Sequence, residues 1–333
     1  MIIVIGATGY IGRYFCTAMA EKGVDVLALG RSKKVQHFFE ENKVPFQYFD
    51  VSDPHCFDQL PTEGVEAIVN LSACLPEHEV PVENFFTVNT LGVYRTLEFA
   101  RQHDIKKVVV TSSHKVYYGT FRPVFSETDP TSFAGDHSPY IISKIAAENF
   151  VEYYNRERGM NAVVLRLTGV HGYGETQGYL AADGAYTKST SELFFEKALK
   201  GEDIEVWGDQ TIKRDHVYIK DVVSALWAAV NSGDARGIYN ISGGIAHSQY
   251  EEALAIAKVF AGEKGKSKVI CRPEKQGLVR GYLYDISKAK RELKWEPKFV
   301  DLVDMYEDYK KEWLRKKYHN YHHYGEGQAP LTV

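Results

Sequence analysis

The chain has 333 residues, with 40 Lys plus Arg against 44 Asp plus Glu and a formal charge of −4. This length can bury a large core, either in two lobes or in one enlarged α/β domain. The balanced charge, without a basic stripe, argues against a nucleic-acid partner, and no apolar run is long enough to predict a membrane-spanning segment.

The first apolar run begins at Met1 without a charged leader, so we expect a cytoplasmic protein. Cys16, Cys56, Cys74 and Cys271 show no CxxC spacing. We therefore expect buried thiols rather than a disulfide framework, and no metal site.

Three glycines follow the first apolar run. Gly6, Gly9 and Gly12 are spaced by three residues, with Tyr10 and Ile11 in the last interval. Glycine permits a tight turn, and the N-terminus of the following helix attracts a phosphate through its N–H groups and dipole. The GxxGxxG pattern is one residue wider than the usual dinucleotide fingerprint. We expect these five residues to bind a dinucleotide, and a purely structural turn is the alternative.

Apolar runs then alternate with helical periodicity, which predicts a Rossmann-like α/β fold with a doubly wound parallel sheet. The expected strands are 1–5, 24–29, 46–49, 67–71, 108–112, 162–167 and 237–242, and the expected helices lie near 33–42, 84–102, 141–158, 189–200 and 216–230. The pattern loosens after Arg166, where glycines accumulate. We expect a dinucleotide-binding domain at 1–167 and 216–246, a smaller discontinuous substrate lobe at 168–215 and 247–315, and a tail at 316–333.

Tyr140 and Lys144 are four residues apart in an expected helix, so their side chains share one face. A neighbouring ammonium favours the tyrosinate and, together with the charge of a bound nicotinamide, is expected to lower the phenol pKa toward the range of a general base. The same spacing recurs at Tyr284 with Lys288 and at Tyr306 with Lys310, so spacing alone does not select the site. Context does, because Ser113 follows a strand whose carboxyl end is where ligands bind in such sheets.

Five features occur in the order typical of extended short-chain dehydrogenases/reductases: Gly6-x-x-Gly9-x-x-Gly12, Asp50, Asn89, Ser113 and Tyr140-x-x-x-Lys144. The chain most resembles the nucleotide-sugar epimerase/dehydratase branch of that family, typified by UDP-galactose 4-epimerase. Further matches are Trp207-Gly208-Asp209, Arg214-Asp215-His216-Val217-Tyr218 and Asp285-Ile286-Ser287-Lys288-Ala289.

The resemblance implies roles for individual residues. Tyr140 is the acid/base, Lys144 holds the nicotinamide ribose and lowers the tyrosine pKa, and Ser113 hydrogen-bonds the same substrate oxygen. Asp50 contacts the adenine and Asn89 shapes the neighbouring helix; Val51, Leu71 and Ala73 complete the cofactor site. Arg214 meets the substrate diphosphate, where Lys275 or Arg280 could supply a second cation. A salt bridge with nearby acidic residues is the alternative for Arg214.

Charge at the end of the second strand bears on the cofactor. NAD enzymes commonly place a carboxylate there, whereas this chain has Gly30 followed by Arg31, Ser32 and Lys33. Arg13, after the last loop glycine, adds another cation. We expect NADP to be preferred, with NAD possible; the alternative is that 31–34 only solvates a helix start.

The expected reaction is reversible oxidation at C4 of a nucleotide-diphosphate sugar, by an epimerase or a C4 ketoreductase. In the family, 4,6-dehydratases carry an Asp-Glu pair where this chain has His114 and Lys115, so dehydration ranks lower. Gly169 stands where the family has a substrate-contacting Asn. The alternatives are an NADPH-dependent reductase of a non-sugar ketone and a non-catalytic NADP-binding redox sensor. The resemblance also implies a homodimer.

Overall fold

The computed structural model describes residues 1–76, 80–131, 138–174, 179–180, 186–261, 265 and 267–319. The chain forms two compact units. The first comprises Met1–Thr168, Ile219–Ile241 and Asp285–Glu296, and the second comprises Gly169–Tyr218, Ser242–Tyr284 and Pro297–Val333. Most of the expected tail, 320–333, lies outside the described residues, as do 175–178 and 181–185 in the glycine-rich stretch.

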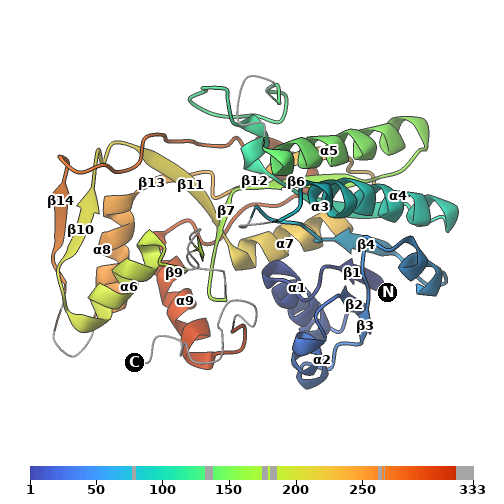
Figure 1. The fold of residues 1–333 in the computed structure, drawn as a ribbon, viewed down its shortest axis with the longest axis horizontal. Helices are drawn as coiled ribbons and strands as arrows, with labels where there is room; N and C mark the ends of the chain where they lie inside the picture. Colours follow the sequence, from blue (N-terminus) through green and yellow to red (C-terminus); the bar gives the residue numbers. More distant parts are fainter. Residues whose placement is uncertain are drawn as a thin grey trace. The chain divides into compact units, whose positions relative to one another are not determined.

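The first unit is built on one seven-stranded sheet in which every neighbouring pair is parallel (Figure 1). Its strands are β1 (Ile2–Ile5), β2 (Val26–Gly30), β3 (Phe46–Tyr48), β4 (Ala67–Asn70), β5 (Lys107–Ser113), β6 (Val163–Leu167) and β12 (Gly237–Ile241). The strand order is β12-β6-β5-β4-β1-β2-β3. The predicted fold class, a Rossmann-like doubly wound sheet, is confirmed.

Helices cover both faces of this sheet, which explains why its strands are nearly continuous apolar runs. Figure 1 shows α1 (Tyr10–Glu21) and α7 (Ile219–Val230) on one side, and α3 (Val82–Asn84), α4 (Gly92–Gln102) and α5 (Pro139–Glu157) on the other. The remaining helices of the unit are α2 (Gln36–Glu41), the 3₁₀ turns η1 (Lys33–Val35), η2 (Pro54–Gln59) and η4 (His114–Tyr117), and the π-helical segments η3 (Phe85–Leu91) and η5 (Ala289–Leu293).

Segment 285–296, assigned from the sequence to the second lobe, packs within the first unit. Asp285 donates its backbone N–H to the carbonyl of Phe125 (2.8 Å), and Trp295 Nε1 donates to Ser224 Oγ (2.8 Å). These contacts join residues more than seventy positions apart in the chain.

The described residues of the second unit form short sheets and three helices. Its strands are β7 (Gly169–His171), β8 (Tyr179–Leu180), β9 (Tyr186–Thr187), β10 (Ile204–Trp207), β11 (Lys213–Tyr218), β13 (Ala246–Ser248) and β14 (Val269–Arg272), and its helices are α6 (Thr190–Lys200), α8 (Gln249–Val259) and α9 (Leu302–Arg315). They form sheets β13-β11-β7, β10-β14 and β8-β9. The helix expected at 216–230 begins only at Ile219, because residues 216–218 pair with β7 as the end of β11.

Two expectations from composition meet different outcomes. Cys16 and Cys56 are buried, as expected, but Cys74 is half-buried and Cys271 is exposed, so the expectation of buried thiols is wrong for these two. Cys271 lies on β14, which pairs with β10 in a two-stranded sheet. No helix within the described ranges is both long and apolar enough to cross a membrane.

Candidate functional site

The glycine loop is compact because its glycines leave no room for a Cβ atom. Gly6 has φ +79°, and a Cβ on it would lie 2.7 Å from the backbone nitrogen of Ser72. A Cβ on Gly12 would lie 2.5 Å from the Cα of Ala7. Gly9 is the N-cap of α1, which has no side-chain capping hydrogen bond and no acidic residue in its first turn. This helix N-terminus, which begins with Tyr10 and Ile11, is therefore suited to a phosphate.

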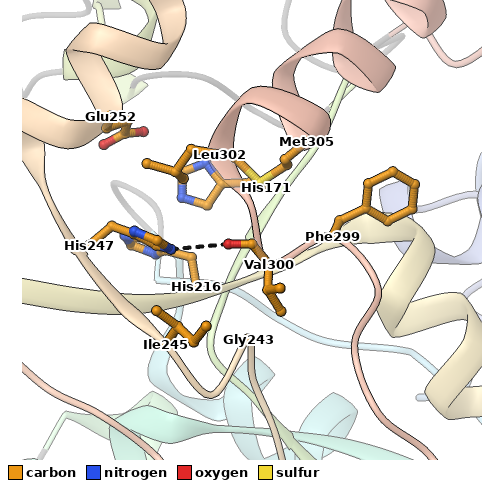
Figure 2. A pocket seen from close by; sticks show the side chains of 10 residues that line it. All are labelled: His171, His216, Gly243, Ile245, His247, Glu252, Phe299, Val300, Leu302 and Met305. Carbon is orange, nitrogen blue, oxygen red and sulfur yellow. Dashed lines mark hydrogen bonds between the residues drawn. The ribbon is translucent and has the colours of Figure 1, made fainter.

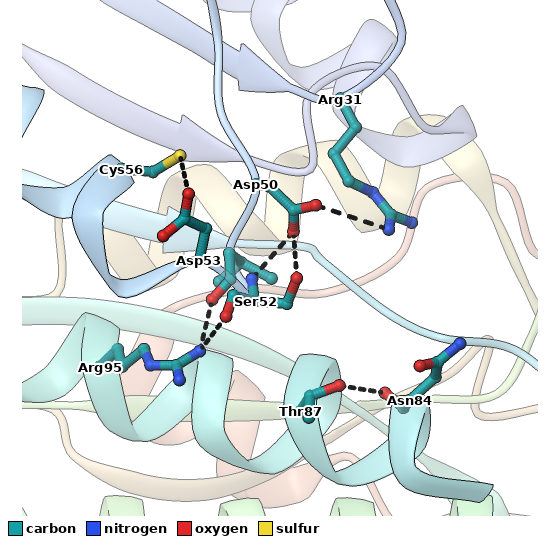
Figure 3. A network of polar contacts seen from close by, with 9 residues as sticks. Arg31, Asp50, Ser52, Asp53, Cys56, Asn84, Thr87 and Arg95 are labelled. Atoms are coloured by element: carbon teal, nitrogen blue, oxygen red, sulfur yellow. Dashed lines mark hydrogen bonds and ion pairs between the residues drawn. The ribbon is translucent and has the colours of Figure 1, made fainter. Parts of the chain in front are cut away.

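A polar network forms the corner next to β2 and β3 (Figure 3). Asp50 Oδ1 accepts hydrogen bonds from the backbone N–H (2.9 Å) and hydroxyl (2.6 Å) of Ser52. Asp50 Oδ2 lies 4.0 Å from the exposed Arg31 guanidinium. Arg95 donates to the carbonyls of Val51 (3.2 Å) and Ser52 (2.7 Å). The corner thus presents a held carboxylate and an exposed cation side by side.

Gly30 ends β2, and a Cβ there would lie 2.6 Å from the side chain of Thr8. The strand end therefore has no space for the carboxylate of typical NAD sites. Ser32 is half-buried and Lys33 is exposed. Arg13, expected beside the cofactor, is instead buried, with its guanidinium carbon 5.8 Å from the Phe38 ring centroid.

Asn89 joins the loop after β4 to the helix that carries Tyr140. Its side chain is fully buried, accepts from the backbone N–H of Cys74 (2.7 Å) and donates to the carbonyl of the same residue (3.1 Å). It also donates to Ser143 Oγ (3.0 Å), which in turn donates to the carbonyl of Tyr140 (2.7 Å). Asn89 therefore fixes α5 against the loop that contains the half-buried Leu71 and Ala73.

Ser113, Tyr140 and Lys144, which are far apart in sequence, are brought together in the first unit. All three are buried, and a hydrogen bond links the side chains of Ser113 and Tyr140. Lys144 Nζ lies 6.0 Å from the Tyr140 ring centroid and donates to the carbonyl of Thr111 (3.1 Å). Because an ammonium has three N–H donors, Lys144 keeps two for a ligand.

The electrostatics of Tyr140 differ from the sequence-based expectation. Burial raises the pKa of the Tyr140 phenol above its ordinary value, and the hydrogen bond with Ser113 only opposes this shift. Burial also lowers the pKa of Lys144 to about 8, against an opposing effect of Glu148. The expected lowering of the Tyr140 pKa by Lys144 is therefore wrong for the protein's own groups, since removal from water outweighs an ammonium 6.0 Å from the ring centroid.

A buried ion pair near Lys144 was not singled out from the sequence. Arg166 on β6 donates to both carboxylate oxygens of Glu148 (2.9 and 2.6 Å) and to the hydroxyl of Tyr117 (2.7 Å). Glu148 is one helical turn after Lys144 on α5. This spacing is the only sequence signal that could have indicated Glu148. The pair fixes α5 on the sheet, one turn from Lys144.

The second unit holds the three expected substrate cations in two places. Arg214 Nε donates to the carbonyl of Arg280 (3.0 Å), and its guanidinium carbon lies 5.5 Å from the Tyr282 ring centroid. No ion pair joins Arg214 to another residue in the described ranges, so the salt-bridge alternative is not observed there. Lys275 instead binds Glu205 (2.6 Å), whose carboxyl pKa is lowered to about 2, mainly by this hydrogen bond.

A pocket in the second unit contains a histidine cluster that the sequence did not suggest (Figure 2). It has a volume of only about 20 Å³ and is lined by His171, His216, Gly243, Ile245, His247, Glu252, Phe299, Val300, Leu302 and Met305. His171 and His216 have ring centroids 4.4 Å apart, and burial lowers the pKa of His171. His247 Nε2 lies 3.3 Å from the carbonyl oxygen of Val300. Within the described part of the chain, no group of three or more His, Cys, Asp or Glu side chains is placed to hold a metal ion.

The cluster gives a physical reason for Gly169. A Cβ at this position would lie 3.0 Å from Nδ1 of His216, which is tight packing. The imidazole thus occupies the space into which a longer side chain at residue 169 would extend. The two residues therefore share one space, although they are 47 positions apart in the chain.

The parallel sheet, the glycine loop at the first helix and the Ser113, Tyr140 and Lys144 cluster together define a dinucleotide-binding α/β enzyme class. The chain belongs to the NAD dependent epimerase/dehydratase family, whose model matches residues 2–242. The resemblance inferred from the sequence motifs is thereby confirmed.

Relatives with assigned names support the same family. The chain is 30% identical over 307 residues to a putative UDP-glucose 4-epimerase of Methanocaldococcus jannaschii, covering 91% of this chain and 95% of that protein. It is similar to the crystal structure of UDP-glucose 4-epimerase from Thermotoga maritima with UDP-glucose, at TM-score 0.71 and 25% identity over 94% of this chain and 99% of that one. The UDP-Glc/GlcNAc 4-epimerase of Campylobacter jejuni shares the fold at TM-score 0.75 and 23% identity, covering 93% and 99% of the chains.

Proposed function

We propose that this protein is a nucleotide-sugar 4-epimerase that uses a nicotinamide dinucleotide to oxidise and re-reduce C4 of the sugar. The observation that carries the proposal is the meeting of Ser113, Tyr140 and Lys144 beside the loop that Asn89 holds. Family membership supports it, as do the UDP-glucose 4-epimerases among the similar proteins.

In this proposal, Tyr140 removes the C4 hydroxyl proton while the C4 hydride leaves, which produces a ketone on the sugar. Ser113 hydrogen-bonds the same oxygen, and Lys144 uses its remaining N–H donors on the ribose of the dinucleotide. A nicotinamide dinucleotide held by the glycine loop would supply the hydride acceptor and, toward the opposite face of C4, the hydride donor. The raised pKa of Tyr140 means that the chain needs further positive charge beside the phenol before it can serve as a base near neutral pH.

The fit of the dinucleotide rests on the glycine loop. The uncapped start of α1, formed by Gly9, Tyr10, Ile11 and Gly12, would hold the pyrophosphate, and Gly6 keeps the turn closed. Asp50, Val51, Leu71 and Ala73 would line the adenosine end. Arg214 and Arg280 would meet the substrate diphosphate. Lys275 would join them only by leaving Glu205, to which it is bonded.

We further propose that NADP is preferred over NAD. Arg31 and Ser32 follow a strand end where Thr8 leaves no space for a carboxylate, so a 2′-phosphate would meet a cation and a hydroxyl. Arg31, which lies 4.0 Å from Asp50, would turn from this carboxylate to bind the phosphate. Affinities for both cofactors should be measured in the wild type and in Arg31→Ala. Equal or tighter binding of NAD by the wild type would overturn the preference.

The activity is tested by supplying UDP-, GDP-, CDP- and dTDP-hexoses together with NADP or NAD and analysing the products by NMR. We expect one series to give the 4-epimer without net consumption of cofactor, and to raise the melting temperature through ligand linkage. Net consumption of NADPH with a keto sugar would favour the ketoreductase reading. Unchanged sugars in every series would overturn the proposal.

A homodimer, a cytoplasmic location and the substrate role of the second unit remain predictions of the family resemblance and the sequence. Size-exclusion chromatography with light scattering tests the dimer directly, since a mass near 37.7 kDa would contradict it. The rival readings, a non-sugar ketone reductase and a redox sensor, differ in what Arg214 does. Only a diphosphate substrate requires its guanidinium.

A further inference from the structure

A second ammonium, that of Lys115, lies at the reacting end of the proposed site. Lys115 is two residues after Ser113, in the 3₁₀ turn η4. Its backbone N–H donates to Ser113 Oγ (3.2 Å), and its Nζ lies 6.0 Å from the Tyr140 ring centroid. The fold therefore ties the main chain of Lys115 to the serine hydroxyl and brings its charged end to the tyrosine ring.

The other basic groups around Tyr140 are already engaged with the protein. Lys144 is buried and bonded to the carbonyl of Thr111. His114 is buried, with Nδ1 3.1 Å from the carbonyl oxygen of Leu167 and Nε2 3.4 Å from the hydroxyl of Tyr118. Lys115 is half-buried instead, and no carboxylate pairs with it in the part of the chain that the structure describes. Its three N–H donors are thus positioned to bind the substrate, whereas the remaining donors of Lys144 are assigned to the ribose of the dinucleotide.

The surroundings of Lys115 favour a negatively charged partner. Tyr140 packs in an apolar cluster with Phe85 and Ile141, against which Tyr118 also packs. An ammonium held beside such a cluster loses part of its hydration, and an ion pair restores the lost stabilisation more effectively than a neutral hydroxyl does. The contact with the Tyr140 ring face, at 6.0 Å, offsets only part of this loss.

We propose that the sugar of the substrate carries a carboxylate next to the reacting carbon, as in a nucleotide-linked uronic acid, and that Lys115 pairs with it. This inference rests on the proposed function, because Tyr140 and Ser113 must hold the C4 oxygen for Lys115 to reach the neighbouring substituent. In a hexuronate that substituent is the C6 carboxylate, which is attached to C5. Lys115 is then the residue that selects charged over neutral sugars.

The test compares UDP-glucuronic acid with UDP-glucose in the wild type, in Lys115→Met and in Lys115→Arg. We expect the wild type to prefer UDP-glucuronic acid by at least tenfold in kcat/KM. Lys115→Met, which keeps length but removes charge, should reduce this preference at least tenfold, mainly through KM, and Lys115→Arg should keep most of it. Lys106→Met, an exposed lysine paired with Asp104, is the matched control and should leave the preference unchanged.

A wild type that prefers UDP-glucose would overturn the inference. So would an equal loss for both sugars in Lys115→Met, since the ammonium would then serve Tyr140 rather than the substrate. Dissociation constants for both sugars, measured by calorimetry, separate this inference from the proposed activity. If neither sugar is turned over, the ratio of the two constants still decides the role of Lys115. Failure of the wild type to bind either UDP sugar would overturn the inference, whereas the proposed activity is decided by the full series of nucleotide sugars.

Discussion

The two units of this chain arrange their polar side chains in different ways. In the first unit, the groups of the proposed site are bonded to the backbone: Asn89 to Cys74, Lys144 to Thr111, and Ser113 to the N–H of Lys115. In the second unit, the histidines gather around a pocket and pack against one another, as His171 does against His216.

The difference distinguishes contacts that the fold requires from contacts that depend on individual side chains. Backbone-bonded groups follow from sheet and helix geometry, so their spacing repeats wherever the fold is used. The side-chain cluster depends on the fit of individual side chains, such as that of His216 against Gly169. We therefore expect cofactor chemistry to depend on the first unit and substrate choice to depend on individual residues.

The largest expected effect comes from removing the hydroxyl of Tyr140, the proposed acid/base of the first unit. Tyr140→Phe keeps the ring in its apolar cluster but removes the hydroxyl, so turnover should fall by about 10²–10⁴-fold, the usual contribution of a general acid/base. Cofactor affinity should stay close to that of the wild type. Steady-state kinetics and cofactor titration check both parts, and near-normal turnover would contradict the assigned role.

The backbone origin of the first site is tested at Gly12. Alanine normally favours a helix over glycine, but the Cβ here would lie 2.5 Å from Ala7 Cα, and neither backbone segment can yield easily. Gly12→Ala should therefore lower the free energy of unfolding by about 3 kcal/mol, at the upper end of overpacking effects, and weaken dinucleotide binding.

Gly23→Ala is the control for this change. No heavy atom lies within 4 Å of a Cβ at Gly23, and only its φ of +73° opposes substitution, so about 1 kcal/mol is expected. Denaturant unfolding compares the two variants. A Gly12→Ala protein as stable as Gly23→Ala would show that the loop has room to move.

Buried lysines of the first unit should make its stability depend on pH. Burial lowers the pKa of Lys144 and of Lys107 from 10.5 to about 8 in each case. Between pH 8 and 10.5 the unfolded chain binds protons that the folded chain has released, so the free energy of unfolding rises with pH across this window. Below pH 8 the full cost of burying both ammonium groups is present.

Each lysine should contribute roughly 2 kcal/mol to this rise. A pKa shift corresponds to about 1.4 kcal/mol per unit, so this contribution is smaller than the free energy that the full shift would give. Unfolding curves at several pH values test it. Lys144→Met and Lys107→Met should each remove about half of the rise, and Lys106→Met, at an exposed site, should remove none. An unchanged slope in both buried variants would contradict the assignment.

The smallest expected effect is that of a substitution at Gly169 in the second unit. Gly169→Ala should cost about 1 kcal/mol, because its Cβ presses on a side chain that can shift slightly rather than on backbone. In a His216→Ala background the same change should cost much less. A double-mutant cycle measures this coupling, and additive effects would show that the two residues do not share space.

Several features followed from the sequence because local rules govern them. The strands at 67–71 and 163–167 and the helix near 141–158 were expected within a few residues, since buried parallel strands and amphipathic helices have distinct periodicities. The glycine loop was recognised by spacing, because Gly6 needs a positive φ and Gly12 has no space for a Cβ.

Other features depend on contacts that no local pattern contains. Residues 216–218 have a helical pattern but form the end of β11, because β7 supplies a pairing partner. The Tyr140 phenol was expected to be acidic beside an ammonium, yet its pKa is raised, because burial is a property of everything packed around the ring.

The sequence by itself determined the dinucleotide fold and the family, and it predicted the reacting groups, because these depend on residue types at fixed spacing along the chain. Only the tertiary structure decided that Arg13 is buried, that Lys275 is bound to Glu205 and that the ammonium of Lys115 lies beside Tyr140. Burial and ion pairing join residues from distant segments, so their outcome is fixed only when the whole unit is packed.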